Sequence, residues 1–234
     1  MRPGRSELIE RFGMFAESKG VSYAMAPMGA LMDREGERTM PKLLFQGHGS
    51  YRLTADDSRV IYVDPYKGKG YDVPADIILV THQHHDHNQV ERCTQKPDCR
   101  IITNYEALVG GKHNHFDLDG IAIQAVEAMN KNHDPKQCVG FIITLDGIKI
   151  YASGDTSRTS QMETFAARGL DYALLPGDGI YNMDLDEAAE CAQLIGAKHN
   201  IIIHLKPGES IREKAEQWKA PNKLIIEPGQ EIAL

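Results

Sequence analysis

Residues 81–87 read THQHHDH, with four histidines and one aspartate in six consecutive positions. In extended chain, side chains two residues apart point the same way, so His82 and His84 could bind one metal ion. Asp86 and His87, at a turn toward a helix, could reach a second ion. A solvated polar loop would also tolerate these residues. The HxHxDH pattern therefore predicts a metal site most strongly if other segments supply further ligands.

Three more residues of metal-binding type follow or end apolar runs. His133 follows IAIQAVEAM, Asp155 follows IKIYASG, and His204 lies within NIIIH. The Asp155 carboxylate could bridge two cations, with the neighbouring hydroxyls of YASGDTS as support. A lone histidine in an apolar strand is more often a buried structural residue, so a ligand role for His204 depends on the other strand ends. Together, four strand ends predict a site that a sheet holds rigid.

The elements that must position these residues are short β-rich runs separated by turn residues. The LDG turn between FIIT and IKIYA indicates a hairpin. Helical stretches are expected at about 87–92, 104–109, 158–168, 184–195 and 209–219, and Asp184 and Gly196 suit the start and end of the fourth. This order predicts an α/β fold with two sheets packed together and helices outside. The strand runs are KLLFQGH, YRLTAD, RVIYVDPY, DIILVTH, RIITNY, IAIQAVEAM, CVGFIITLDGIKIYASGD, DYALLPG, NIIIHL and KLIIEPG.

The chain length and composition favour one main domain. With 234 residues and 41% hydrophobic residues, the chain can bury a substantial core. Residues 41–234 are expected to form that domain. Residues 1–40 are expected to be an N-terminal extension, with an amphipathic helix from about Ser6 to Lys19 followed by an irregular lead-in. This extension could form a subunit contact in a homo-oligomer or a flap over the site.

Charge and cysteine usage exclude several classes of partner. The net charge of -7 argues against general binding to nucleic acid or to an anionic membrane, because both require a basic face. The longest apolar runs, such as IILV at 77–80, are far shorter than a membrane span. The four scattered cysteines are typical of reduced thiols, so we expect a cytoplasmic protein.

Several ordered motifs resemble the metallo-β-lactamase superfamily. THQHHDH, GDT and the final strand histidine carry this resemblance over about residues 42–206. More narrowly, FQGHGSYRL, VIYVDPY, AMNKNHDPK, DGIKIYASGDTS and DYALLPGDGIYNMD resemble a branch of uncharacterised metal-dependent hydrolases related to L-ascorbate-6-phosphate lactonase. The resemblance implies a four-layer αββα sandwich with a two-metal site at one edge.

The resemblance also implies a set of ligands. AMNKNHDPK departs from the commoner short pattern of the family, so Asn130 or Asn132 could stand in place of His133. His85 occupies a variable position and is expected to be exposed or to contact the ligands. The implied ligands are His82, His84 and His133 for the first ion, Asp86, His87 and His204 for the second, and Asp155 between them.

The expected activity is hydrolysis by a metal-bound hydroxide at a dinuclear site. Imidazole and carboxylate ligands suit two divalent ions, Zn²⁺ or Mn²⁺. By resemblance, Asp86 would orient the hydroxide and pass a proton to the leaving group. Only thirty residues follow His204, which leaves little room to bind a macromolecule. We therefore expect a small, anionic substrate such as a lactone or a phosphoester.

Three residues outside the ligand set are candidates for contact with the substrate or with the ligands. They are His48 in GHGS, Asn182 in GIYNMD and Lys206, which follows His204 by two positions. Two alternatives to a hydrolase use the same ligands. The chain could be a metal-binding regulatory protein without turnover, or a di-iron redox protein on the same fold.

Overall fold

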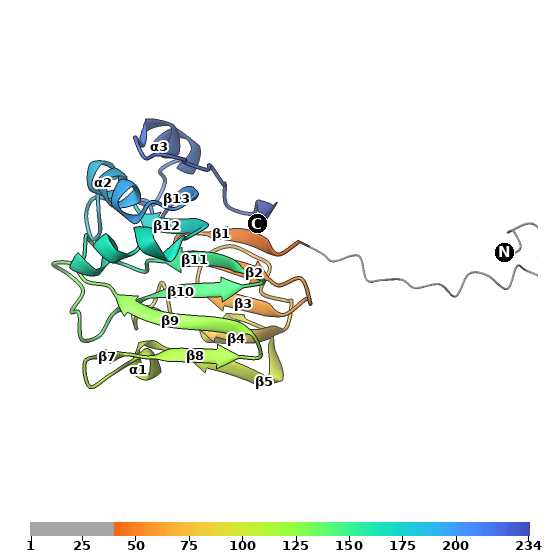
Figure 1. Cartoon of the computed structure of the whole chain (residues 1–234). Helices are drawn as coiled ribbons and strands as arrows, with labels where there is room; N and C mark the ends of the chain where they lie inside the picture. The colour runs from red at the N-terminus through yellow and green to blue at the C-terminus, as the bar shows by residue number, and fades with distance from the viewer. Residues whose placement is uncertain (1–39) are drawn as a thin grey trace, which may run out of the picture. The chain divides into compact units, whose positions relative to one another are not determined.

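Short apolar runs fold into two six-stranded sheets in the part of the chain that the structure describes (Figure 1). The structure is a computed structural model, and it describes residues 40–234. The predicted helix from Ser6 to Lys19 and the rest of the expected extension lie outside the described residues. In the first sheet, the strands lie in the order β14 (Glu231–Ala233), β1 (Lys42–Gly47), β2 (Ser50–Thr54), β3 (Val60–Val63), β4 (Ala75–Leu79) and β5 (Gln95–Ile102).

The second sheet has the same mixed character as the first. Its strands lie in the order β13 (His199–Ile203), β12 (Tyr172–Pro176), β11 (Ile148–Ala152), β10 (Val139–Leu145), β9 (Ile121–Glu127) and β8 (His115–Leu118). The neighbours β11, β12 and β13 are parallel, as are β3, β4 and β5 in the first sheet. The remaining pairs are antiparallel. A two-stranded ribbon of β6 (Leu108–Val109) and β7 (Lys112–His113) stands apart from both sheets.

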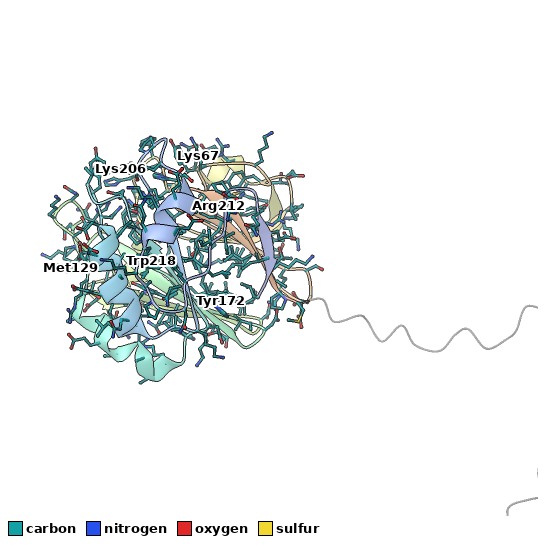
Figure 2. All side chains as sticks on the ribbon, turned by 90° about the horizontal axis from the view of Figure 1, so that it is seen from above. Lys67, Met129, Tyr172, Lys206, Arg212 and Trp218 are labelled. Atoms are coloured by element: carbon teal, nitrogen blue, oxygen red, sulfur yellow. The ribbon has the colours of Figure 1, made fainter. Side chains whose placement is uncertain are left out.

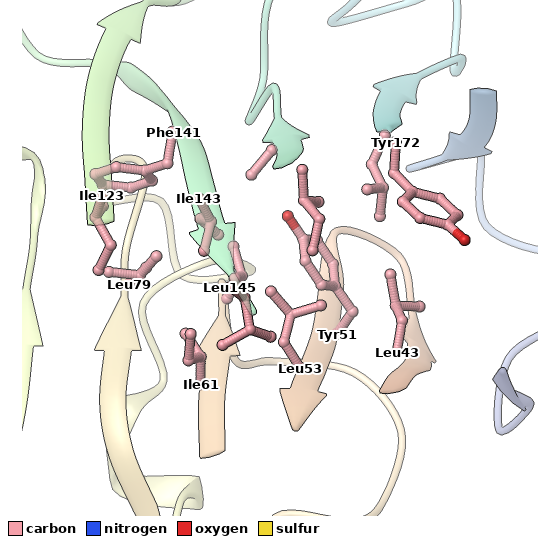
Figure 3. Packing of buried hydrophobic residues seen from close by; sticks show 14 of the residues in the cluster. Leu43, Tyr51, Leu53, Ile61, Leu79, Ile123, Phe141, Ile143, Leu145 and Tyr172 are labelled. Atoms are coloured by element: carbon pink, nitrogen blue, oxygen red, sulfur yellow. The ribbon is translucent and has the colours of Figure 1, made fainter. Parts of the chain in front are cut away.

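The main core lies between the two sheets. In β9, the residues Ile121, Ile123 and Ala125 alternate with less buried ones, as expected for a strand with one face in the core. Figure 3 shows the side chains of both sheets meeting. The first sheet contributes Leu43, Tyr51, Leu53, Ile61 and Leu79, and the second contributes Ile123, Phe141, Ile143, Leu145 and Tyr172.

The outer layers differ between the two sheets. Helices α2 (Leu185–Ile195) and α3 (Ile211–Gln217) cover the outer face of β12 and β13, where Trp218 is buried (Figure 1). The outer face of the first sheet is covered mainly by the loop that carries Tyr71 and by the short 3₁₀ helix η1 (Val90–Arg92). The predicted α/β fold with two packed sheets is confirmed, and the helical layer over the first sheet is thin.

Local sequence signals explain most element ends. Asp146 and Gly147 both have positive φ, which is the type I′ geometry that a two-residue hairpin requires, so the LDG hairpin is confirmed. The Asp184 side chain accepts hydrogen bonds from the first backbone amides of α2, and Gly196 ends that helix in left-handed conformation.

The predicted helices differ in part from the observed ones. The stretch 104–109 contains α1 (Asn104–Ala107), and 209–219 contains α3. The stretch 87–92 forms only η1, and 158–168 forms two 3₁₀ helices, η2 (Ser160–Thr164) and η3 (Ala166–Arg168). The run KLIIEPG is not a strand, and only Lys223 makes an isolated bridge there. Within the described residues, no helix is both long enough and apolar enough to cross a membrane.

The strand directions bring several strand ends to one edge of the sandwich. Strands β1, β3 and β4 run in the same direction within the first sheet, and β9, β11, β12 and β13 do so within the second. The residues that follow these strands therefore lie at the same edge, although they are far apart in the sequence. This edge contains every predicted metal ligand.

Candidate metal centre

The seven predicted ligands lie on loops at the ends of four strands. His82, His84, Asp86 and His87 follow β4, while His133, Asp155 and His204 follow β9, β11 and β13. Their ligand atoms form overlapping groups in which all atoms lie within 4.8 Å of one another. The structure thus brings together residues separated by as many as 122 positions in the chain, from His82 to His204.

Three histidines form one group, which we name the His82 set (His82, His84 and His133). The Nε2 atom of His82 lies 3.0 Å from Nδ1 of His84, and Nε2 of His133 lies 3.2 Å from the same Nδ1. Ligand nitrogens around a tetrahedral Zn²⁺ are about 3.3 Å apart, given Zn–N bonds of about 2.0–2.1 Å. The spacing of the His82 set is therefore close to what one bound ion requires.

Three more residues form the His204 set (Asp86, His87 and His204), with His48 beside them. Nε2 of His87 lies 3.2 Å from Nε2 of His204. His48 Nε2 lies 3.1 Å from Asp86 Oδ2, and the His48 ring centroid lies 3.7 Å from that of His204. One ligand atom from each of these four residues falls within the same 4.8 Å group. The sequence predicted that His48 contacts the substrate or the ligands, and the structure places it against Asp86 and His204.

Asp155 lies between the two sets. Its Oδ2 is 3.3 Å from Nε2 of His133, and its Oδ1 is 3.3 Å from Nε2 of both His87 and His204. The carboxylate is 5% exposed, and Oδ1 accepts no hydrogen bond from the described residues. A buried carboxylate oxygen without a donor is costly unless a cation compensates it. This oxygen is positioned to meet one.

The outer nitrogens of four histidines face acceptors. His82 Nδ1 lies 3.1 Å from Thr81 Oγ1, whose own proton goes to Asp64. The other three Nδ1 atoms face the oxygens Asp64 Oδ2 for His87 (2.8 Å), Asn130 Oδ1 for His133 (2.8 Å) and Asp178 Oδ2 for His204 (3.3 Å). For His82, His87 and His133, an acceptor at Nδ1 fixes the proton there and leaves a lone pair on Nε2. Nδ1 of His204 lies near Asp178 without the geometry of a hydrogen bond.

The inner nitrogens of the histidines are arranged as a metal ion requires. Nε2 of His87 lies 3.2 Å from Nε2 of His204. Two nitrogens at this distance need a proton or a metal ion between them, because two lone pairs would repel. Partners of this kind behind the ligands are also what metal-binding histidines usually have. The residues present therefore fit divalent metal ions.

Residues 42–204 match the family model for the β-lactamase superfamily domain, which is more than half of the chain. The chain belongs to the metallo-β-lactamase superfamily. A metal-dependent hydrolase of Methanoculleus marisnigri is 30% identical over 219 residues, covering 82% of this chain and 96% of that protein. One of Pyrococcus furiosus is 28% identical over 227 residues, covering 83% and 100%.

This superfamily member is also similar to a solved structure. A Parabacteroides distasonis protein classed as a metal-dependent hydrolase has a TM-score of 0.67 and 31% identity, covering 81% of this chain and 94% of that one. The predicted superfamily and its αββα fold are confirmed. The narrower relation to L-ascorbate-6-phosphate lactonase stays a prediction.

The candidate ligands differ in the direction in which their pKa values are shifted. Burial and the nearby His87 lower the pKa of His82 to about 2, so this imidazole is neutral at ordinary pH. Burial works against a charge on His87, but the carboxylates of Asp155 and Asp64 outweigh it and raise its pKa to about 9. Burial likewise opposes ionisation of Asp155, and the surrounding imidazoles, His87 first, lower its pKa. In the metal-free chain a proton on His87 thus balances the central carboxylate.

The backbone is strained at this edge. His48, Asp64 and His204 all have positive φ, between 46° and 56°, which costs energy in residues with a Cβ atom. Gly154, just before Asp155, has φ of +61°, and a Cβ atom there would lie 2.9 Å from Cβ of Thr81. Such conformations persist where surrounding contacts impose them, which is common at functional sites in proteins.

The other predicted site residues take different places. Asn182 is buried behind the ligands, Lys206 lines a groove beside them, and the side chain of His85 is 82% exposed, as expected for its variable position. Asn130 accepts from His133 through Oδ1, and Asn132 donates to the Tyr181 carbonyl. Neither asparagine replaces His133, whose Nε2 faces the other ligands.

Sequence reasoning missed several residues that hold the ligands. The hydroxyls around Asp155 do not support it: Ser153 Oγ donates to the Gly154 carbonyl, and Thr156 Oγ1 donates to backbone carbonyls and accepts from the Met129 amide. Carboxylates and a hydroxyl at other strand ends instead contact the outer nitrogens of the histidine ligands. The residues missed or undervalued are Asp64, Thr81 and Asp178, each shortly after an apolar strand.

Proposed function

We propose that this protein is a metal-dependent hydrolase that acts with two divalent ions on a small anionic substrate. The observation that carries the proposal is the buried Asp155 carboxylate, which has one oxygen facing each set of histidines. The relatives are named metal-dependent hydrolases, and the match covers nearly their whole length. Both facts support the reaction class. The spacing of the ligand atoms supports the number of ions.

The proposed ligands divide into two sets. The His82 set would hold one ion and the His204 set the other, with Asp155 between them. Nitrogen and oxygen donors without a thiolate suit Zn²⁺ and Mn²⁺. Two divalent ions held there would lower the pKa of a shared water toward neutrality and polarise the oxygen of a carbonyl or phosphoryl group.

Asp86 would handle the proton of the attacking water. Burial opposes its ionisation, but the hydrogen bond from His48 and the nearby His87 together outweigh burial and lower the pKa of Asp86, so Asp86 is an acceptor at neutral pH. Its side chain is 27% exposed and lines the groove beside the site, so it can meet both water and substrate. Asp86 would orient the water and pass its proton to the leaving group.

The groove beside the His204 set would bind the anionic part of the substrate. It has a volume of about 550 Å³, and Lys67 and Lys206 both line it (Figure 2). Neither lysine forms an ion pair with any residue in the range 40–234. The groove's acidic residues are already engaged, since Glu209 pairs with Lys214 and Asp86 bonds to His48. Two uncompensated ammonium groups favour an anion.

Among the described residues, the side of the site near the His82 set has no lysine or arginine in its lining. A smaller hollow of about 190 Å³ lies beside the His82 set. Apart from those histidines, it is lined mainly by uncharged polar and aromatic residues and by one exposed carboxylate, namely Gln83, Asn104, Tyr105, Asn132, Asp134, Gln137 and Cys138. The two sides therefore favour a substrate with an anionic end and a neutral polar end, such as a phosphorylated lactone or a phosphodiester.

A hydrolysis screen tests the reaction class. Lactones, phosphodiesters, phosphomonoesters and thioesters would be tested after chelation and again after addition of Zn²⁺ or Mn²⁺. We expect turnover that chelation removes and metal restores, and that His84→Ala abolishes. The matched control is His199→Ala, because His199 is exposed at the opposite end of β13. Metal-independent turnover, or turnover retained in His84→Ala, would contradict the proposal.

The lysine groove is tested with paired substrates. For a substrate that is turned over, Lys67→Met and Lys206→Met should each raise KM by roughly three- to tenfold when the substrate carries an anionic group. They should leave KM for its neutral analogue unchanged. Lys219→Met, at an exposed lysine outside the groove, is the control for overall charge. Equal effects on both analogues would refute the role of the groove.

A further inference from the structure

Two separate networks of hydrogen bonds and close polar contacts support the ligands from behind, and each one reaches both ligand sets. The first is centred on Asp64, at the end of β3. Its carboxylate accepts from the amide and hydroxyl of Thr81 and from Nδ1 of His87, at 2.7–2.8 Å. The Thr81 hydroxyl in turn faces Nδ1 of His82. One buried aspartate therefore orients a histidine of the His82 set and a histidine of the His204 set.

The second network lies on the other side of the site and is centred on Asn182. The side-chain carbonyl of Asn182 accepts a hydrogen bond of 2.8 Å from Asn130 Nδ2, and Asn130 Oδ1 accepts from His133. The Asn182 amide donates a hydrogen bond of 2.7 Å to Asp178 Oδ2, the same oxygen that faces His204. The chain of contacts thus runs from His133 to His204.

We infer that Asn182 is a positioning residue that couples the two metal sites. Its planar amide has an acceptor at one end and donors at the other, so one side chain can satisfy Asn130 and Asp178 together. Asn182 is 8% exposed, and its backbone amide also approaches Asp178 Oδ1 at 3.2 Å. The residue is therefore held from both sides. This inference rests on the proposed two-metal function and goes beyond it by assigning a role to a residue that binds neither ion.

Coupling follows from the shared support. An ion bound by the His82 set fixes His133, which fixes Asn130 and, through it, Asn182. Asn182 then holds Asp178 where it orients His204 before a second ion arrives. A group that is already ordered costs less to bind, so the first ion favours the second, and by linkage the effect is reciprocal.

Stepwise metal affinities test the coupling. The two Zn²⁺ dissociation constants would be measured by chelator competition for the wild-type chain, Asn182→Leu and Asn182→Ser. Leucine has similar volume but no hydrogen bonds, whereas serine leaves room for a bridging water. We expect Asn182→Leu to weaken both ions by roughly tenfold and Asn182→Ser to weaken both by less. The matched control is Asn132→Ala, because Asn132 lies on the same loop as His133 and its side chain donates only to the Tyr181 backbone.

Asn130→Ala, compared in the wild-type and Asn182→Leu backgrounds, distinguishes the coupling from a general loss of order at the site. This substitution removes the partner of His133, and among the ligands Asn130 contacts only the His82 set. It should also weaken the second ion in the wild-type background, and clearly less in the Asn182→Leu background, where the connection through Asn182 is already broken. Proton NMR of the imidazole Nδ1–H groups would show both His133 and His204 exchanging faster with water in Asn182→Leu.

The outcomes separate the inference from the proposed function. If the wild-type chain binds two ions and Asn182→Leu weakens only one or neither, the coupling is refuted and the two-metal proposal stands. An equal loss in Asn132→Ala would also refute it, because the effect would then belong to the loop. A wild-type chain that binds fewer than two ions would refute both.

Discussion

Replacing Asp155 with asparagine removes the charge that lies between the two ligand sets and keeps the shape of the side chain. The carboxylate is buried, and each of its oxygens lies 3.3 Å from at least one imidazole Nε2. An asparagine has one neutral oxygen and one NH₂ group, which cannot serve as a second ligand. We therefore expect Asp155→Asn to weaken both ions together.

The magnitude follows from the number of ligands. A four-ligand zinc site contributes about 10–16 kcal/mol of binding free energy, so one ligand is worth about 3 kcal/mol. That difference is about 100-fold in a dissociation constant. Because Oδ1 faces the His204 set and Oδ2 faces His133, the ion that meets the NH₂ group should lose about this much. The ion that meets the remaining oxygen should lose less, because that oxygen is a neutral ligand. Loss of an anionic ligand rather than a neutral one makes the first of these losses a lower bound.

Chelator competition with Zn²⁺ would measure both dissociation constants in the wild-type chain and in the variant. The control is Asp184→Asn, which removes a charge at the start of α2 where asparagine caps equally well. Wild-type affinity for both ions in Asp155→Asn would refute the bridging position. So would a loss confined to one ion.

Two further predictions concern the metal-free chain. Its stability should be greatest near neutral pH. The pKa of His87 is raised to about 9, which contributes about 3 kcal/mol to the free energy of unfolding. This contribution is fully present below pH 6.5 and is lost as the pH rises through 9. The pKa of His82 is lowered to about 2, so this residue destabilises the fold as the pH falls below 6.5. Urea unfolding from pH 5 to 10 measures this, and a stability that rises steadily to pH 10 would contradict it. Separately, Gly154→Ala should cost about 1–3 kcal/mol, because the new Cβ meets Thr81 at 2.9 Å in a left-handed conformation, and an unchanged midpoint would contradict that.

The gathering of the candidate ligands at one edge of the sandwich was largely predictable from the sequence. The dense cluster THQHHDH favours metal binding because it supplies several imidazoles and a carboxylate within one turn, and Asp155 and His204 follow apolar runs that are strands in the structure. The parallel strands β11 and β13 then bring these two residues to one edge. Periodicity and turn chemistry are local signals, so they predict strands and hairpins well.

The residues that support the ligands were less predictable, because their roles depend on contacts across the fold. Asp64 lies in VDPY, which is equally typical of a turn, and its contact with His87 spans 23 residues. Asp178 was not distinguished from other loop aspartates, although it faces His204. The stretch 158–168 looks helical in sequence, but tertiary packing of Met162 and Phe165 leaves it as two 3₁₀ turns. Propensity is a weak guide where packing decides.

We propose that this edge of the sandwich holds two divalent ions, one at the His82 set and one at the His204 set. Elemental analysis of the chain, purified without chelators and reloaded with Zn²⁺ or Mn²⁺, tests this most directly. We expect two ions per chain in the wild type and in His85→Ala, because the His85 side chain is 82% exposed, and a loss of bound metal in His84→Ala. One ion or fewer in the reloaded wild-type chain, or full metal content in His84→Ala, would contradict it.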